Sequence, residues 1–462
     1  MSIMIRAIGQ AARRGATRRV PNAATLLGAI DDWLPGATGD ALRGHMPGAR
    51  TVDGAIEIAL HPAARPVRFE ATDTGQLVVT ALTVPVGPGY HTYVASLLER
   101  MGDELAITWA RLATPSPGAT GRVAGDGTRV AGDGAPGRPG PNPTVSIDPT
   151  GAFGSGDRRD AERGHLGWLR SALRAVSDAR RQGVGGLHLG TPAGVRFTFD
   201  GAVATVLGPR DDDWLERAVG DPRVAADVWP WVADAMDARY LLGRALTQLW
   251  LEVRWRPPVG TTELALADDV LGTLRRAYSL EPGLAWPWRE WRELLALRGE
   301  PDSATRQLID RAVPKMGGPA GSGEPPQIGY RRRPVTIVHA GWTLEVPGAF
   351  TSLLTSEEWV GGEAGRSVTF AGTATVEGGQ PMSADRYLRQ AAGHLGRDAI
   401  EHDDGVVRGR ARLASDPSSG VEVATVEGFS AVRGRGAAMR IVIDDPQDWK
   451  WALDTWRSLR PA

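Results

Sequence analysis

The residues of this chain that could do chemistry are few and widely spaced. His61 and His91 share one segment, but neither belongs to a pair four residues apart, the spacing with which a helix presents two histidines to zinc. Asp211, Asp212 and Asp213 are consecutive, and carboxylate oxygens suit Mg²⁺ or Ca²⁺. These five residues are the candidates for an anion or metal site, or for a hydrolase or metal-dependent enzyme of unknown class.

Each candidate also has an ordinary structural interpretation. The stretch PVGPGYHTYV at 85–94 predicts a turn from a strand into a helix, with His91 in the first turn and off the buried stripe. A helix N-terminus there could hold an anion, and His45 could join the two other histidines around a metal. The three aspartates equally fit a helix start, where Asp caps free N–H groups.

No catalytic motif stands out elsewhere. EGFSAV comes closest to a nucleophile elbow, but Val432 replaces the second glycine after Ser430, and a strand is expected next where the elbow needs a helix. The arginines of RGR at 408–410 and RGRG at 433–436 fit a small anion patch or a solvated surface. We therefore assign no catalytic residue, no metal and no cofactor from the sequence.

Composition narrows the class of protein. The formal net charge is −1, which gives no overall field for nucleic acid or an anionic membrane. Only two of the 53 basic residues are lysines, a bias typical of a GC-rich bacterial genome, and there is no cysteine for a disulfide or a thiolate. No apolar run is long enough to span a bilayer. These features predict a cytoplasmic bacterial protein without a membrane span or a nucleic-acid partner.

The elements that would position the candidates predict a multidomain α+β protein. Strands are expected at 54–60, 67–72, 76–84 and 105–110, with a helix from Tyr90. Two stretches rich in Gly and Pro separate the domains. The predicted parts are a disordered basic tail at 1–25, an α+β domain at 26–112, a flexible insert at 113–145, a β-hairpin (195–207) with a helical region at 146–313, a linker at 314–334, and an α+β domain at 335–462.

The middle region, from 211 to 297, is helical in pattern and dense in tryptophan. Two helices broken at EPG resemble one helical hairpin of a tetratricopeptide repeat at 262–297, although no second copy is visible. The tryptophans could form the core or rim of a small bundle. Alternatively they could line a peptide groove, for which the candidates are Trp286, Trp288, Arg289, Trp291 and Arg292.

The last region predicts the order strand, strand, helix, three strands, helix, which is typical of an α+β sandwich with an antiparallel sheet. The closing helix is expected to turn Trp449 and Trp456 toward the sheet and Trp451 toward a partner. This order, with GWTLEVPG at its entry and TWRSL at its end, resembles the Mog1/PsbP-like (DUF1795-type) domains over residues 335–460. The resemblance implies a binding module that folds by itself, with no catalytic motif and no transferable partner.

Taken together, these patterns favour a non-enzymatic protein-binding or adaptor protein, with a defence or toxin-immunity locus as one setting. The partner is expected to be another protein, and no cofactor is expected.

Overall fold

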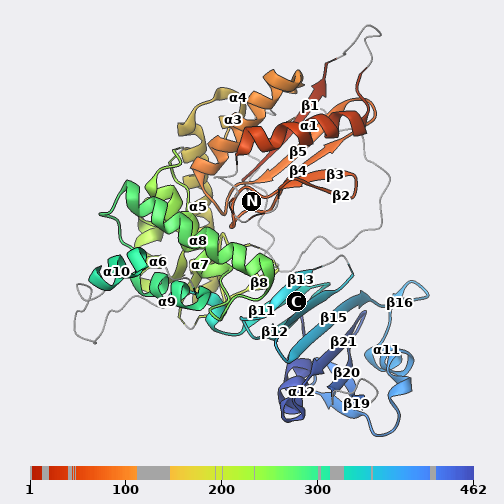
Figure 1. Ribbon diagram of the computed structural model, residues 1–462. Coiled ribbons are helices and arrows are strands. Elements are labelled where there is room, and N and C mark those ends of the chain that lie inside the picture. Colours follow the sequence, from red (N-terminus) through yellow and green to blue (C-terminus); the bar gives the residue numbers. More distant parts are fainter. Residues whose placement is uncertain are drawn as a thin grey trace. The chain divides into compact units, whose positions relative to one another are not determined.

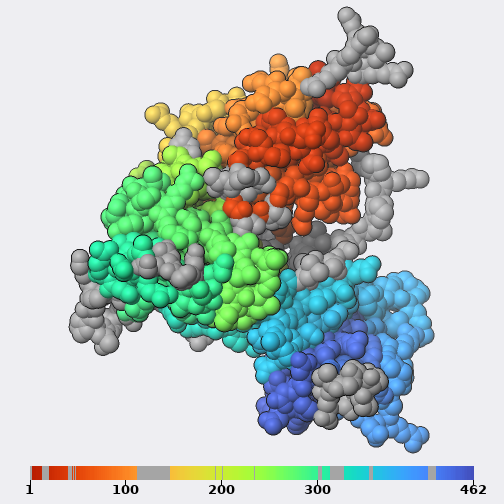
Figure 2. Space-filling model, viewed as in Figure 1, coloured from red at the N-terminus to blue at the C-terminus, as the bar shows by residue number. Residues whose placement is uncertain are grey.

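The computed structural model describes residues 3–12, 20–39, 44, 46, 48–111, 146–192, 194–199, 201–233, 235–299, 303–312, 327–354, 357–416 and 423–462 (Figures 1 and 2). The chain divides into two compact units. Among the described residues, unit 1 holds those up to 192 and those from 198 to 329, and unit 2 holds 194–197 and 330–462. The predicted flexible insert and His45 lie outside the described residues.

Unit 1 is built on an antiparallel sheet with the strand order β2-β3-β4-β5-β1-β6. Its strands are β1 (Met4–Ala11), β2 (Arg50–Val52), β3 (Ala55–Ile58), β4 (Val67–Ala71), β5 (Gln76–Leu82) and β6 (Ile107–Trp109). Helices α1 (Ala23–Thr38) and α3 (Pro88–Leu105) contact each other and the sheet. One row across four strands, Ile56, Phe69, Val79 and Ala7, is almost fully buried. This alternation of inward apolar residues fixes the strand register.

The prediction of a disordered tail at 1–25 is wrong for the residues that form β1. This strand pairs with β5 on one side and with β6 on the other, so it is an interior strand of the sheet. Ile3, Ile5 and Ala7 alternate along it and are at most 1% exposed. The arginines that suggested a tail obscured this short period-two pattern, and burial of the apolar side chains stabilises the strand.

The remainder of unit 1 is mainly helical (Figure 1). A small sheet of β7 (His188–Leu189), β9 (Val203–Thr205) and β10 (Gly208–Arg210) accompanies it. The helices are α4 (Ala152–Ser155), α5 (Arg158–Arg181), α6 (Asp212–Gly220), the 3-10 helix η1 (Val224–Val228), α7 (Ala238–Leu251), α8 (Gly260–Leu280), α9 (Trp288–Arg298) and α10 (Ser303–Ala312). Helix α8 packs against both α7 and α9, so the expected helical pair around EPG is present.

The hairpin predicted at 195–207 does not form. β8 (Val195–Arg196) pairs with a strand of unit 2, whereas β9 pairs with β10 and β7. The Asp-Gly turn signal is local, but the partner of each strand is decided by long-range pairing. The linker predicted at 314–334 also ends early, because Tyr330 is buried and stacks on Phe197 with ring centroids 4.4 Å apart.

Unit 2 contains antiparallel sheets and is α+β, as predicted. The larger sheet has the order β13-β14-β15-β21-β20-β19-β18, and a smaller one has the order β22-β12-β11-β8. The strands are β11 (Val335–His339), β12 (Trp342–Val346), β13 (Thr351–Leu354), β14 (Trp359–Glu363), β15 (Arg366–Ala374), β18 (Ile400–Asp403), β19 (Arg408–Asp416), β20 (Val423–Val432), β21 (Arg435–Ile443) and β22 (Arg460–Pro461), with a separate hairpin of β16 (Val376–Glu377) and β17 (Gln380–Pro381). Helices α11 (Ala384–Ala391) and α12 (Trp449–Arg457) pack on β20 and β21.

Helix α12 corrects one orientation assigned from the sequence. Trp456 is 1% exposed, as predicted, but Trp449 is 48% exposed because it occupies the first turn, beyond the part of the helix that meets the sheet. Trp451, predicted to face a partner, is half-buried: its ring lies 4.8 Å from the guanidinium of Arg366 and 6.0 Å from the ring of Phe350.

Candidate functional site

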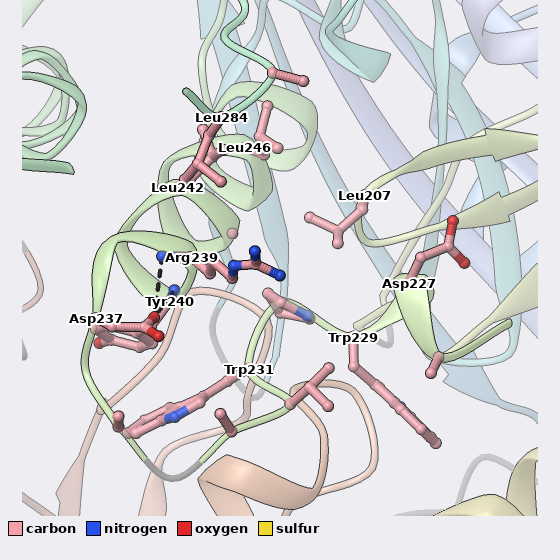
Figure 3. A pocket seen from close by; sticks show the side chains of 17 residues that line it. Leu207, Asp227, Trp229, Trp231, Asp237, Arg239, Tyr240, Leu242, Leu246 and Leu284 are labelled. Atoms are coloured by element: carbon pink, nitrogen blue, oxygen red, sulfur yellow. Dashed lines mark hydrogen bonds between the residues drawn. The ribbon is translucent and has the colours of Figure 1, made fainter. Parts of the chain in front are cut away.

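An apolar groove of about 680 Å³ lies beside the first half of α7 in unit 1 (Figure 3). It was not predicted from the sequence, because its lining comes from three separated segments, at 207, 226–246 and 284–285. The lining includes Leu207, Trp231, Leu242, Leu246, Leu284 and Ala285. Such a concave surface with few polar groups is typical of binding sites for apolar ligands or side chains.

The start of α7 sets one wall of the groove. Asp237 is the N-cap residue, and its carboxylate accepts hydrogen bonds of 3.0 Å from the backbone N–H groups of Arg239 and Tyr240. Capping satisfies two of the free donors at the helix end. Leu242 and Leu246 follow one turn apart, so both side chains face the groove (Figure 3).

The opposite wall, residues 229–233, is held by the stretch that begins α3. The indole of Trp229 donates to the carbonyl of Val84 at 3.0 Å, and the N–H of Trp231 donates to the carbonyl of Val86 at 3.0 Å. In the opposite direction, the N–H of Gly89 donates a hydrogen bond of 3.1 Å to the carbonyl of Trp231. The strand-to-helix turn at 85–89 therefore positions the groove wall.

Gly89 allows this close approach because it has no side chain. A Cβ atom there would collide with the carbonyl oxygen of Ala233 and lie 2.5 Å from Cδ1 of Trp231. We expect Gly89→Ala to lower the free energy of unfolding of unit 1 by about 1–3 kcal/mol, since overpacking shifts the surrounding backbone. Urea unfolding followed by tryptophan fluorescence measures this loss.

Gly28→Ala is the control for this substitution. Gly28 lies on the exposed side of α1, where a Cβ would meet nothing within 4 Å. Alanine is favoured over glycine in a helix interior, so this variant should be as stable as the parent or more so, by up to about 1 kcal/mol. Equal stability of Gly89→Ala and the parent would contradict the assigned role of Gly89.

A cluster of aromatic rings lies directly behind the groove. Trp231 and Tyr240 have ring centroids 4.4 Å apart, and Tyr90, Tyr93 and His61 pack around them at 5.3–6.4 Å. Burial raises the pKa of Tyr90, and it raises the pKa values of Tyr93 and Tyr240 to about 12. The three hydroxyl groups are therefore protonated at neutral pH and do not provide a base.

His61 is neutral for the same reason. Burial and the positive charge of Arg244 lower the pKa of His61 well below its usual value. Its Nδ1 accepts the N–H of Ala63 at 3.1 Å, so the proton of the neutral ring is on Nε2. Arg244 is itself buried and pairs with Asp269 at 3.2 Å, which offsets the cost of its burial.

His91 is fully buried, and the prediction that it lies off the core stripe is wrong. The apolar stripe predicted from the sequence accounts only for the face of α3 that packs on the sheet. The segment from Asp148 onward and α5 cover the other side of α3. Nδ1 of His91 is 2.9 Å from Oγ1 of Thr83, and Nε2 is 3.0 Å from Oγ1 of Thr150 and 3.3 Å from Asp148. Its polar atoms are thus engaged inside the unit.

Asp148 and His165 complete this buried cluster, and neither was identified from the sequence. Burial acts to raise the pKa of Asp148, but hydrogen bonds from His91, Phe153 and Thr150 lower it to about 2. The ring of His165 lies 5.4 Å from that of His91, and burial together with this neighbour lowers its pKa to about 3. The arrangement joins α3, α4 and α5 internally.

The three aspartates serve the start of α6. Asp211 is the N-cap residue and accepts the N–H of Trp214 at 2.8 Å, and Asp212 pairs with Arg180 at 2.8 Å. The structure therefore places His61, His91 and Asp211 in three separate settings. Within the described residues, no group of three or more His, Asp or Glu side chains could hold a metal ion.

The predicted peptide-groove residues divide into buried and exposed sets. Trp286 and Trp291 are 5% and 0% exposed and pack with Tyr278 in the core of the helical region. Trp288 is half-buried and stacks on Trp291, while Arg289 and Arg292 are exposed. The tryptophans favour the bundle interpretation, and burial removes two of them from any surface site. Ser430 is also buried, within β20.

Comparison with protein-family models found none that matches this chain, and comparison with curated proteins found no significant match. Among the helices of the described residues, none is both long and apolar enough to cross a membrane.

Proposed function

We propose that this protein is a non-enzymatic binding protein and that the apolar groove beside α7 receives a segment of another protein. The observation that carries the proposal is the groove itself, with its apolar lining and its firmly bonded walls. A preformed concave surface lowers the ordering cost of binding. The partner segment would contribute apolar side chains to the groove.

Exposed apolar residues at the groove support a macromolecular partner. Val232, which lines the groove, is 39% exposed, and Met236, between two lining residues, is 43% exposed. Leu280, the last residue of α8 and four residues before the lining residue Leu284, is 59% exposed. Exposed apolar side chains at the edge of a groove are typical of a protein interaction site, because their contact with water is unfavourable.

Arg239 gives the groove a preference for a negatively charged residue in the partner segment. Its side chain is 74% exposed and lines the groove, where Figure 3 shows the guanidinium projecting among the labelled side chains. Glu281 is 3.7 Å away and is also largely exposed, so that pair contributes little. An acidic residue in the partner segment would pair with Arg239 once water is displaced, which fixes the orientation of the segment.

The test fills the groove without removing a core contact. Ala285 lines the groove and is exposed, so Ala285→Trp should place an indole in it. We expect this variant to lose at least about 90% of a partner captured by the parent protein and identified by mass spectrometry, because about 1.4 kcal/mol of lost binding is tenfold in affinity. Titration calorimetry with the purified partner then gives the change in affinity.

Ala296→Trp is the matched control, since Ala296 is exposed on α9 and is not part of the groove lining. It should retain the partner at the parental level. Equal retention by Ala285→Trp, or equal loss in both variants, would overturn the groove as the binding site.

For unit 2 the resemblance to Mog1/PsbP-like domains is kept as a proposal for residues 335–460. Its support is that the expected strands and helices follow in the expected order from β11 through α11 to α12, with further strands such as β13, β14 and β18 among them. In this proposal unit 2 is a second binding module. The tetratricopeptide likeness of α8 and α9 is likewise a proposal, supported by their packing as neighbouring helices.

A further inference from the structure

A second pocket in unit 1, distinct from the apolar groove, is rimmed by arginines. It has a volume of about 730 Å³ and lies between α5 and the end of α6. Arg163, Arg170 and Arg174 line it from α5, and Arg223 lines it from the segment after α6. From these residues we propose that the pocket binds a small molecule that carries two or more phosphate groups.

Helical spacing explains why the cations converge. Positions 163, 167, 170 and 174 recur every three or four residues and therefore share one face of α5. Gly167 lies within this row and has no side chain, which leaves the helix surface open between the arginines. The guanidinium group is the side chain best suited to phosphate, because it presents several N–H donors in one plane.

These charges are mostly uncompensated by the protein. Arg163 pairs with Asp160 at 2.9 Å. No carboxylate in the described part of the chain pairs with Arg170, Arg174 or Arg223. Asp221 is the one acidic residue among those that line the pocket, and its carboxylate accepts the backbone N–H of Arg223 at 3.0 Å. An anion with several charges would therefore find more positive than negative charge here.

The pocket is also firmly built. Leu166 and Val219 line it and pack against the core formed by α5, α6 and the small sheet. The arginine row thus projects from a rigid helix over a partly apolar floor. The four arginines surround one compact pocket, which fits a small oligophosphate better than an extended polymer.

The test is titration calorimetry of the full chain with inorganic triphosphate at low and moderate salt. We expect saturable binding that weakens about tenfold or more in the double variant Arg170→Ala/Arg174→Ala, since charge-assisted contacts to phosphate are lost. The matched control is Arg159→Ala/Arg181→Ala, which removes the same charge from exposed positions of the same helix outside the pocket lining. Its affinity should stay within about twofold of the parent, because general charge effects are weak and screened.

Three results would overturn the proposal: no binding of triphosphate, equal weakening by the two double variants, or tighter binding of hexaglutamate or of a single-stranded oligonucleotide than of triphosphate. The last result would assign the pocket to an acidic peptide or to nucleic acid. Thermal unfolding of both variants checks that they fold. Because the groove variant Ala285→Trp lies elsewhere in unit 1, failure of this proposal and failure of the proposed function can be told apart.

Discussion

Replacing Trp456 with alanine is expected to lower the free energy of unfolding of unit 2 by about 3–5 kcal/mol. Trp456 is 1% exposed and packs over Gly409 of β19 and Gly428 of β20. Side chains at either glycine would lie within 2.7 Å of the indole, so the backbone of the sheet forms the floor of its site. The cavity left by alanine cannot be filled by these strands. Urea unfolding of the full chain measures the loss.

Trp449→Ala is the matched control in the same helix. Trp449 is 48% exposed, and surface substitutions usually change stability by less than about 0.5 kcal/mol. Both variants lose the same side chain and one tryptophan fluorophore. A difference between their unfolding free energies therefore reports the burial of the side chain. A loss for Trp449→Ala as large as that for Trp456→Ala would contradict the orientation of α12.

Acidification from pH 7 to pH 5 is expected to destabilise unit 1 by at least about 2 kcal/mol. His61 and His165 have folded-state pKa values below the ordinary value near 6.5, for His165 about 3, because burial disfavours their charged forms. The unfolded chain therefore binds protons that the folded unit does not. Each histidine contributes stability that is present above about pH 6.5 and is lost as pH falls toward the folded pKa. For His165 the loss is about 2 kcal/mol at pH 5, and His61 adds a loss in the same direction.

Asp148 changes the stability of unit 1 at lower pH than the histidines do. Its pKa of about 2 in the folded unit lies below the unfolded value, so its contribution is present above about pH 4 and is lost between about pH 4 and pH 2. Between pH 7 and pH 5 the contribution of Asp148 is therefore nearly constant, and a loss of stability in this range is assigned to His61 and His165. This separation makes the assignment to particular residues testable.

Substitution of single histidines shows which residue causes the pH dependence of the unfolding free energy of unit 1. His165→Gln should reduce the loss of unfolding free energy of unit 1 between pH 7 and pH 5 by about 2 kcal/mol, whatever its effect on stability at pH 7. His394→Gln is the control, because His394 is an exposed residue of unit 2. A slope unchanged by His165→Gln would show that this histidine titrates alike in the folded and unfolded chain.

Local patterns in the sequence predicted the strands of unit 1 near 54–84, helix α3, and in unit 2 the strands β11, β12, β15, β19, β20 and β21 and the helices α11 and α12, but not the strands β13, β14 and β18. These are places where apolar spacing and turn residues agree with the final fold. The strand β1 was missed because four arginines, at positions 13, 14, 18 and 19, follow it closely in the sequence. The 195–207 hairpin was wrong because β8 and β9 have different long-range partners. Pairing between distant segments is not encoded in local periodicity.

The candidate site was less predictable. The stretch at 85–94 was correctly interpreted as a strand-to-helix turn, but its contact with residues 229–233 is a tertiary contact that spacing does not reveal. The burial of His91 depends on Asp148, which follows the insert. The exposed Val232 and Met236 gave no signal of their own, because exposure is decided by how the fold covers each residue.

Strand β8 means that unit 2 is not a continuous piece of the chain. Residues 194–197 leave unit 1 after β7, pair with β11 through Thr336 and Ile337, and return to β9. Within the described ranges, the backbone therefore passes between the units three times, and cutting it once near residue 320 would not release either unit. A fragment that starts at Tyr330 would leave the N–H and C=O groups along one side of β11 unpaired, a template for pairing with another chain. Transplanting unit 2 into a fusion protein would require residues 194–197 as an added strand.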